Sequence, residues 1–229
     1  KMKVYRKVPK SKCYEQTGKG PIGVRWIDVN KQGEDDPLYR SRLVAKDFNN
    51  YKDPDLYTAI PPLELLRMIV SVAASKEDNK GVQWKVMIND VSRAYFYAES
   101  LKPTFVQICE EDFEEGDEDK CGELLVSMYG TRPAAGNWQR CYTELLKANG
   151  FKCAMSSTCI FHHPEKDVLV FVHGDDFVST ASGEDLLWFK KVLEGKFEIK
   201  SKTIGHSEKD DKTVKILNRI ITVTETGFT

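Results

Sequence analysis

The chain has 229 residues, of which 41% are hydrophobic and 30% charged, and its formal net charge is −1. Such a composition is that of a globular protein, and the near-zero charge excludes a uniformly basic nucleic-acid coat. No run of about 18 apolar residues exists, so we expect no membrane-spanning segment. The first residues, KMKVYRKVPK, lack the apolar core of a signal peptide. We therefore expect an intracellular protein, in the cytoplasm or the nucleus.

The charges are unevenly distributed along the chain. Residues 1–60 hold 13 Lys and Arg against 8 Asp and Glu, whereas residues 61–120 hold 7 against 13. The basic segment is suited to meet phosphates, while the acidic one repels them or binds metal. Most of the excess acid lies between Glu110 and Asp119. We expect a solvated loop there, because so many carboxylates cannot all be buried.

Residues 22–46 have the pattern of a β-hairpin. The strand PIGVRWIDVN is followed by KQGEDDP, a turn by its Gly, Asp and Pro content, and by the returning strand LYRSRLVAK. Side chains alternate between the two faces of a strand, so every second residue shares a face. The basic residues grouped in this way are Arg40, Arg42 and Lys46, with Lys31 near the tip.

The middle of the chain predicts two helices and a strand. Apolar residues at helical spacing predict a helix over 61–76, where proline is tolerated in the first turn. Alternation predicts a strand over 82–90, and a second apolar stripe predicts a helix over 133–149 that ends at Gly150. The strand residues expected on one face are Val82, Trp84, Val86 and Ile88.

The last third of the chain predicts two more hairpins and a helix. The apolar run VLVFV at 168–172 predicts a buried strand, HGDD a tight turn and FVST the returning strand. Ser182 followed by Asp185 predicts the start of a helix that ends near Gly195, and the tail 213–229 predicts a hairpin. Because helices and hairpins are mixed, we expect an α+β fold with a mainly antiparallel sheet.

Three acidic residues follow or end apolar strands. Asp175 and Asp176 lie at the tip of the buried hairpin, and Asp90 ends the strand over 82–90. A turn acid is common, so HGDD alone leaves a plain turn and a functional site equally open. Three carboxylates at strand ends of one sheet can hold two divalent cations about 4 Å apart, as nucleotidyl transfer requires. We therefore predict a two-metal site for Mg²⁺, with Mn²⁺ as the alternative ion.

Cysteine and histidine residues give a weaker metal signal. Six cysteines without a CxxC pair predict reduced thiols. Cys159, His162 and His163 cluster loosely, but no second ligand pair stands at zinc spacing. We expect a strand end with surface histidines there.

Five segments in order resemble successive blocks of the copia-type retrotransposon reverse transcriptases. They are YRSRLVAKDF (39–48), WKVMINDVSRAYFYAE (84–99), LLVSMYGTRPAAGNW (124–138), GFKCAMSSTCIF (150–161) and VLVFVHGDDFVST (168–180). DVSRAYF is also similar to the first catalytic block of retroviral reverse transcriptases. The resemblance covers nearly the whole chain, and five blocks in order are a more specific signal than any one of them.

The resemblance implies the fingers and palm of a right-hand polymerase, with packed helices on the palm sheet. The implied divisions are fingers at 1–82 and 117–137, and palm at 83–116 and 138–229. The implied function is RNA-directed DNA polymerase, which adds deoxynucleotides from dNTPs to a primer on an RNA or DNA template. The implied partners are primer–template nucleic acid and the remainder of a retrotransposon polyprotein, including RNase H and integrase.

The resemblance also implies roles for single residues. Asp90 would be the first metal ligand and Asp175 and Asp176 the paired acids. Tyr95 would lie beneath the nucleotide sugar, with a core tyrosine as the alternative. The residues implied to contact the triphosphate are Lys31, Arg40, Arg42 and Lys46, and the alternative for them is a solvated basic strand face. Lys200 would lie near the leaving pyrophosphate. KILNRII (215–221) would begin the primer-contacting hairpin.

The sequence departs from the family pattern at several points. The acid turn is His-Gly-Asp-Asp where Tyr-Val-Asp-Asp is usual, and Pro133 stands where glutamine is usual. The segment ELLV (123–126) stands where basic residues are usual. The chain ends at Thr229, which leaves no room for a thumb domain. We therefore expect a weak or inactive polymerase. Two further interpretations stay open: a catalytically impaired remnant acting as a nucleic-acid-binding or structural domain, and a palm-type nucleotide cyclase.

Overall fold

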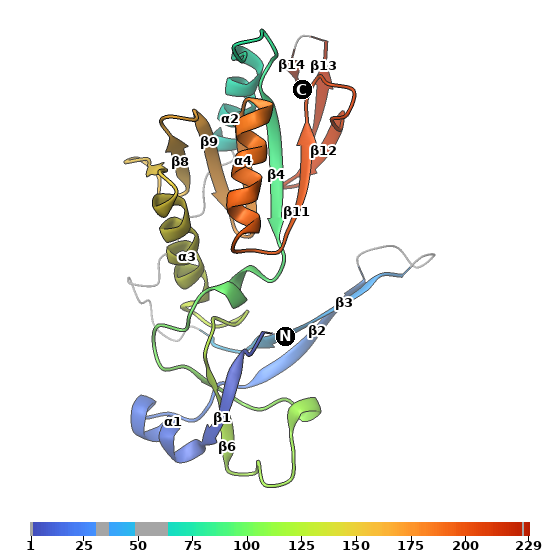
Figure 1. The fold of residues 1–229 in the computed structure, drawn as a ribbon. Helices are drawn as coiled ribbons and strands as arrows, with labels where there is room; N and C mark the ends of the chain where they lie inside the picture. The colour runs from blue at the N-terminus through green and yellow to red at the C-terminus, as the bar shows by residue number, and fades with distance from the viewer. Residues whose placement is uncertain (1, 31–36, 49–63, 226) are drawn as a thin grey trace. The chain divides into compact units, whose positions relative to one another are not determined.

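The computed structural model describes residues 2–30, 37–48, 64–225 and 227–229 (Figure 1). Two compact units make up the chain, Lys1–Thr58 with Tyr95–Cys141 and Ala59–Ala94 with Tyr142–Thr229. The helix expected at 61–76, which the sequence analysis grouped with the N-terminal residues, packs in the second unit. Residues 95–116, grouped there with the palm, belong to the first unit. The helix packs in the second unit because the sheet of that unit buries its apolar face.

The second unit is built on a six-stranded sheet with the order β11-β4-β10-β9-β8-β7. Neighbouring strands are antiparallel throughout the described sheet, which confirms the expected sheet type. The strands are β4 (Lys85–Val91), β7 (Lys152–Cys153), β8 (Ile160–His163), β9 (Val168–His173), β10 (Asp176–Ala181) and β11 (Ile199–Ile204).

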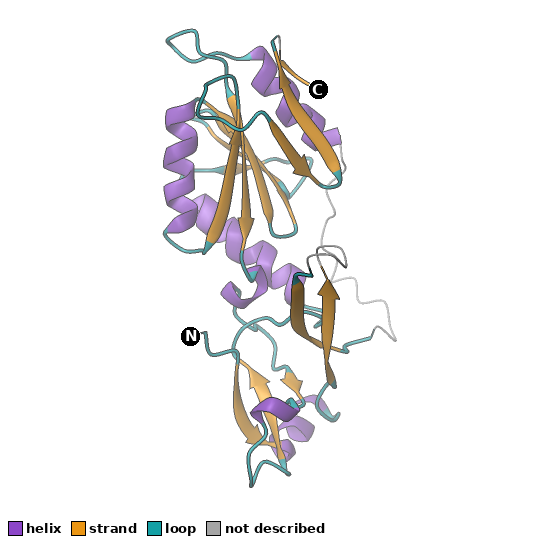
Figure 2. Cartoon of the chain, turned by 90° about the vertical axis from the view of Figure 1, so that its right-hand side faces the viewer, coloured by secondary structure: helices purple, strands orange, loops and turns teal. Residues whose placement is uncertain are grey.

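Helices cover both faces of this sheet (Figures 1 and 2). On one face, α2 (Glu64–Ser75) packs its buried residues against β4, β9, β10 and β11. The other face meets α4 (Gly183–Glu194) and the second half of α3 (Ala134–Ala148), where the Tyr142 ring stands edge-on to Phe177. Burial of both faces explains why simple alternation described β4 incompletely. Val82, expected on the apolar face, precedes the strand and is 44% exposed, whereas Met87, which that face did not include, is buried.

Local signals place the helix ends as predicted. The Ser182 side chain accepts a hydrogen bond from the Asp185 backbone N–H at the start of α4. After α3, Gly150 adopts φ +87°, and the Phe151 N–H reaches back to the Leu146 carbonyl over 3.1 Å. Such a left-handed glycine satisfies the last helical carbonyls without the steric penalty that a side chain would add.

The C-terminal residues form the predicted hairpin. Strands β12 (Thr213–Ile216) and β13 (Arg219–Thr224) pair antiparallel, and β14 (Gly227–Phe228) adds to β13. The buried side chains of β12 and β13 join the core formed by α2 and the sheet. Among the described residues no helix combines the length and apolar character needed to cross a membrane.

The first unit contains a three-stranded sheet, β1-β6-β5, and the two-stranded hairpin β2-β3. The hairpin confirms the strands expected within 22–46, while its predicted turn at 31–36 lies outside the described residues. The elements are β1 (Tyr5–Pro9), α1 (Lys10–Thr17), β2 (Val24–Asn30), β3 (Tyr39–Ala45), β5 (Phe105–Val106) and β6 (Lys120–Leu124), with short 3₁₀ turns η2 (Ala94–Tyr97) and η3 (Glu110–Asp112).

The end of β3 is held by the segment Met128–Gly130. The Ala45 N–H donates to the Tyr129 carbonyl over 2.8 Å, and the Asp47 N–H donates to the Gly130 carbonyl over 3.3 Å. Gly130 has φ +83°, and a Cβ at this position would lie 2.1 Å from the Ala45 carbonyl oxygen. Only glycine permits this close approach of two backbones.

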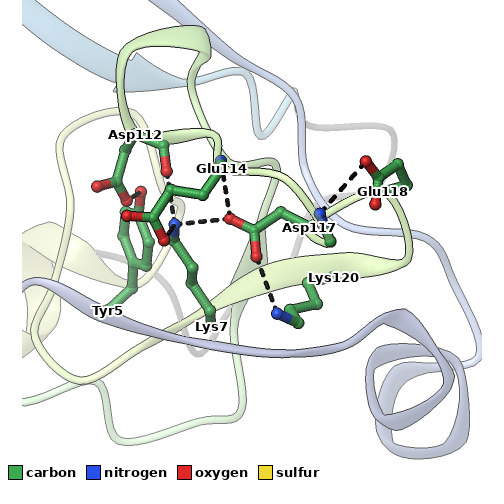
Figure 3. Close-up of polar contacts among 8 residues, drawn as sticks. Tyr5, Lys7, Asp112, Glu114, Asp117, Glu118 and Lys120 are labelled. Carbon is green, nitrogen blue, oxygen red and sulfur yellow. Dashed lines mark hydrogen bonds and ion pairs between the residues drawn. The ribbon is translucent and has the colours of Figure 1, made fainter.

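Asp117 is the centre of an ion-pair cluster in the acidic loop (Figure 3). Its carboxylate accepts hydrogen bonds from Lys7 at 2.6 Å, Lys120 at 3.0 Å and the Glu114 backbone N–H at 3.1 Å. The residue is only 2% exposed. The expectation of a solvated loop was therefore wrong at Asp117, because two ammonium groups and a backbone donor compensate its burial.

A second carboxylate pairs with the same N-terminal segment. Glu123 accepts hydrogen bonds from Arg6 at 2.7 Å and Lys12 at 2.8 Å. Together with the Lys7–Asp117 pair, these contacts neutralise part of the basic segment internally. The interpretation of residues 1–60 as a phosphate-facing segment consequently does not hold for Arg6, Lys7 and Lys12.

We predict that Gly130→Ala destabilises the protein by about 3 kcal/mol, because a clash with backbone adds to the cost of positive φ. Urea unfolding measures the change. The matched control is Gly18→Ala, where φ is +67° but nothing lies within 4 Å of the added Cβ. We expect only roughly 1–2 kcal/mol there. Equal effects of the two substitutions would contradict the close approach at Ala45.

We predict that part of the stability is lost as the pH falls from about 4 to about 2. Hydrogen bonds from Lys7 and then Lys120 lower the pKa of Asp117 to about 2, and Arg6 has the same effect on Glu123. A carboxyl group whose pKa is lower in the folded state than in the unfolded state stabilises the fold at any pH above the unfolded-state pKa. This stabilisation is lost as the carboxyl becomes protonated at lower pH. Thermal unfolding of Asp117→Asn should show a flatter acid limb, whereas Glu115→Gln, at an exposed position of the same loop, should follow the wild type.

Candidate active site

Two of the predicted acids face each other across neighbouring strands. Asp176 on β10 stands directly opposite Asp90 on β4. Asp175 precedes it in the turn, and its carbonyl accepts a hydrogen bond from the Val91 N–H over 3.0 Å. Directly opposite residues of an antiparallel pair project to the same face, with Cβ atoms about 5 Å apart. The Asp90 and Asp176 carboxylates thus lie on one face at one end of the sheet.

The turn that carries Asp175 is the tight one that the sequence predicts. His173 and Asp176 are paired, so Gly174 and Asp175 form a two-residue hairpin loop. Gly174, the first of the two, has φ +62°. A type II′ turn requires positive φ at this position, and glycine adopts it without strain. A Cβ at Gly174 would have no heavy atom within 4 Å, so only the backbone conformation restricts the residue here.

The three acids influence one another electrostatically. Burial, together with the charges of Asp175 and Asp90, raises the pKa of Asp176 to about 6. A carboxyl that lies among other carboxyls and away from water resists ionisation. Within the described part of the chain, no three His, Cys, Asp or Glu side chains are already spaced as metal ligands. The structure therefore brings the acids together, while their role as ligands stays a prediction.

Two further polar residues extend the acid pair into a row across four strands. Lys200 on β11 stands opposite Asp90, and His173 on β9 stands opposite Asp176. We define the acid row as His173, Asp176, Asp90 and Lys200, in the order of the strands β9, β10, β4 and β11. The sequence analysis named Lys200 from a weak match and did not name His173 as a site residue. The signal for His173 was present, since it replaces the usual tyrosine of the acid turn.

Asn89 anchors the strand that carries Asp90. It is fully buried, and its Oδ1 accepts a hydrogen bond from the Ser201 hydroxyl over 2.7 Å. Ser201 stands opposite Asn89 on β11, so the bond links the two strands immediately beside the acid row. Sequence reasoning missed this contact, because it depends on the register of strands far apart in the chain.

Aromatic rings and an arginine form a cluster in the first unit. The Arg42 guanidinium lies 5.0 Å from the centroid of the Tyr129 ring. Tyr129 in turn contacts Tyr95 at 4.7 Å and Phe96 at 5.7 Å between ring centroids. Tyr95 is half-buried within this cluster, which leaves both of its predicted roles open. Arg40 is half-buried two residues before Arg42 on the same strand.

The other predicted basic residues differ in their settings. Lys46 is exposed, its N–H donates to the Gly23 carbonyl over 2.8 Å, and its side-chain stem passes over Gly23. Strand pairing thereby extends one residue past β3. Lys31 lies outside the described residues. At the start of α3 the Pro133 carbonyl accepts the Asn137 N–H over 3.0 Å, so proline fits this helix start as expected.

The histidines near Cys159 are not both on the surface. His163 is 7% exposed, and its ring packs against Phe151 and Trp188 at 5.1 and 5.0 Å. His162 contacts the Asp167 carboxylate at 2.8 Å. The expectation of surface histidines was therefore wrong for His163, because its ring packs between Phe151 and Trp188 of α4.

Comparisons with known proteins agree with the family resemblance. The family described as reverse transcriptase (RNA-dependent DNA polymerase) matches residues 3–208. Over 178 residues the chain is 22% identical to the retrovirus-related Pol polyprotein from transposon TNT 1-94 of Nicotiana tabacum. This match covers 74% of the chain but only 13% of that polyprotein.

Among solved structures, the chain is similar to apo telomerase from Candida tropicalis truncated from the C-terminal domain. The TM-score is 0.44 at 12% identity, over 96% of this chain and 58% of that one. The family match extends over most of the sequence and includes every described residue of the acid row. The chain belongs to the reverse transcriptase (RNA-dependent DNA polymerase) family and is a domain of the copia type.

Proposed function

We propose that the chain is a reverse transcriptase core that adds deoxynucleotides to a primer on an RNA or DNA template. The observation that carries this proposal is the register of β10 and β4, which sets Asp176 opposite Asp90. A strand slip of one residue would turn one of the two carboxylates to the other face of the sheet. Family membership supports the class of reaction, and the acid row supports the proposed location.

The donor chemistry of the three acids fits two magnesium ions. Asp90, Asp175 and Asp176 offer hard carboxylate oxygens, the ligands that Mg²⁺ prefers. Burial, and then the negative charges of Asp175 and Asp90, raise the pKa of Asp176, and a bound cation would offset this effect. Carboxylates that repel one another turn apart, and rotation about their side-chain bonds can bring them to a shared ion. Bound there, the ions would supply Lewis acidity for the primer hydroxyl and charge for the leaving oxygen.

The cationic residues of the chain would hold the phosphates. Lys200 is exposed and stands opposite Asp90, and it would meet the leaving pyrophosphate. In the first unit, Arg40 and Arg42 would bind the triphosphate through the fixed fork of guanidinium donors. Arg42 rests on the Tyr129 ring, which restricts the guanidinium without occupying its donors with a carboxylate.

Tyr95 would select the sugar of the incoming nucleotide. Its contact with Tyr129 fixes one side of the ring, and its partial exposure leaves another side available to a ligand. A ring held beneath a sugar excludes a 2′-hydroxyl by steric contact. By the family resemblance, we assign the fingers to the first unit and the palm to the second. We also propose that the chain acts within a larger polyprotein, because it matches a Pol polyprotein.

Template-directed addition of one nucleotide tests this function. We predict that the 229-residue protein, given a primer–template, one complementary dNTP and Mg²⁺, extends the primer slowly and by few nucleotides. Extension is slow because Pro133 lacks the side chain of the usual glutamine. Asp90→Asn and Asp176→Asn should reduce the rate of addition at least about 100-fold, since each replaces a negatively charged ligand that would hold the Mg²⁺ ions.

The matched control is Asp211→Asn, at an exposed position of the same unit. It should extend primers at the wild-type rate. Addition that survives Asp90→Asn would contradict the proposed site. Magnesium binding by the wild type without any addition would instead favour the nucleic-acid-binding remnant, and cyclisation of a nucleoside triphosphate without primer would favour a cyclase.

A further inference from the structure

A cavity of about 260 Å³ in the first unit is lined by an excess of cationic residues. Lys19, Lys102 and Arg132 contribute to its wall, against one acidic residue, Asp47, among the lining residues that the structure describes. All four belong to the first unit. We call this cavity, with its four charged residues, the basic cavity. The family resemblance assigns none of the four to a substrate, so their charge has no part in the proposed function.

Backbone pairing brings Lys19 and Lys102 to the same side of one bridge. Ile22 and Val106 form a parallel bridge, in which the Ile22 N–H donates a hydrogen bond to the Phe105 carbonyl over 2.8 Å. Lys19 precedes Ile22 by three residues, and Lys102 precedes Val106 by four. Because the two bridged segments run in the same direction, both lysines lie before the bridge. Two segments far apart in the sequence thus each contribute one lysine to the cavity wall.

The backbones of these two lysines are fixed, while their ammonium groups are not engaged. The Lys19 carbonyl accepts hydrogen bonds from the Thr17 hydroxyl at 3.0 Å and from the Cys13 thiol at 3.2 Å. The Lys102 carbonyl accepts one from the Thr104 hydroxyl at 3.0 Å. Neither ammonium group has a hydrogen bond or ion pair among the described residues, in contrast to the lysines of β1 and α1. Both ammonium groups therefore keep their donors for a ligand.

Buried side chains form part of the cavity wall. Phe105 and Cys13 are 2% and 1% exposed. Charges beside such a wall are screened less by water than charges on an open surface, so the cations of the cavity repel one another more strongly there. The Asp47 carboxylate accepts a hydrogen bond from the Arg132 backbone N–H over 2.9 Å, and its one negative charge leaves two positive charges in excess. An anion in the cavity would offset this excess.

We propose that the basic cavity binds a phosphate group, which the ammonium groups of Lys19 and Lys102 contact. An ammonium group is a compact charge with three donors, and it suits phosphate oxygens that approach from different directions. Two sources of ligand share this chemistry, a free polyphosphate anion and the backbone of a single-stranded nucleic acid. The inference needs neither a metal ion nor the acid row, so its failure and the failure of the proposed function are separate results.

Acylation of the lysines of the full chain, followed residue by residue by mass spectrometry, tests the inference without any enzymatic readout. The probes are inorganic pyrophosphate and a short oligothymidylate, each without divalent ions. An anion bound beside an ammonium group favours its charged form, which does not react with the acylating reagent. We expect saturating probe to slow the acylation of Lys19 and Lys102 at least about threefold. Lys3, exposed in the same unit, should keep its rate.

Charge removal gives a second measurement. The double variant Lys19→Gln with Lys102→Gln should bind the probe about tenfold more weakly. For oligothymidylate, the slope of log affinity against log salt should become shallower by about 1.4, because each lysine that neutralises a phosphate accounts for roughly 0.7. The control, Lys3→Gln with Lys209→Gln, loses the same charge at exposed positions outside the cavity. Its affinity should stay within about twofold of the wild type.

The two probes distinguish the sources of the phosphate. Protection of Lys19 and Lys102 by pyrophosphate identifies a free polyphosphate as a ligand, and protection by the oligothymidylate alone identifies a nucleic-acid backbone. Both results support the phosphate site. If neither probe protects these lysines more than it protects Lys3, or if the two double variants lose equal affinity, the basic cavity is not a phosphate site.

Discussion

The pairing of β10 with β4 is the constraint on which the rest of the structure depends. One alternation of side chains places Ile88 and Val178 in the core beneath α2 and sets Asp90 opposite Asp176 at the end of the same strands. A shift by one residue would expose the apolar side chains and separate the acids. Hydrophobic burial along the strands therefore fixes the position of the charges at their ends. The burial of Asp176 beside Asp175 and Asp90 has an electrostatic cost, visible in its raised pKa, which the buried core offsets.

Charges in the first unit divide into two groups with different roles. Lys7 pairs with Asp117 (Figure 3), and Arg6 pairs with Glu123, so the acidic loop and β6 hold the N-terminal strand by ion pairs. Arg42 instead packs on the Tyr129 ring. Three basic residues of the N-terminal segment, Arg6, Lys7 and Lys12, thus pair with carboxylates of the acidic segment and of β6. Net charge counted along the chain does not distinguish these groups, because it contains no information on pairing.

Elements with strong periodicity or clear end signals could be predicted from the sequence. The helix α2 has a continuous apolar stripe, α4 begins at the Ser182 cap, and Gly150 ends α3. The polar helix α1, with Cys13 as its one buried residue, and the two-residue strands β5 and β7 were missed, because so few residues produce no periodic pattern. Asp90, Asp175 and Asp176 followed from strand ends and from the family resemblance. Their register, and with it His173 and Asn89, could not be predicted, since contacts between distant strands are not encoded in local patterns.

Thermal unfolding of Asp176→Asn against pH, without added metal, tests the central claim most directly. The folded-state pKa of Asp176, about 6, lies above its ordinary value, so the wild type pays an increasing penalty as the pH rises from about 4 to about 6. We predict that the variant and the wild type have equal free energies of unfolding near pH 4. Above pH 6 the variant should be more stable by on the order of 1 kcal/mol, solvent screening included, which raises its melting temperature by roughly 2–4 °C. Asp211→Asn should show no such gain. A constant difference between Asp176→Asn and the wild type across this range would contradict the burial of Asp176 beside the other acids at the end of the sheet.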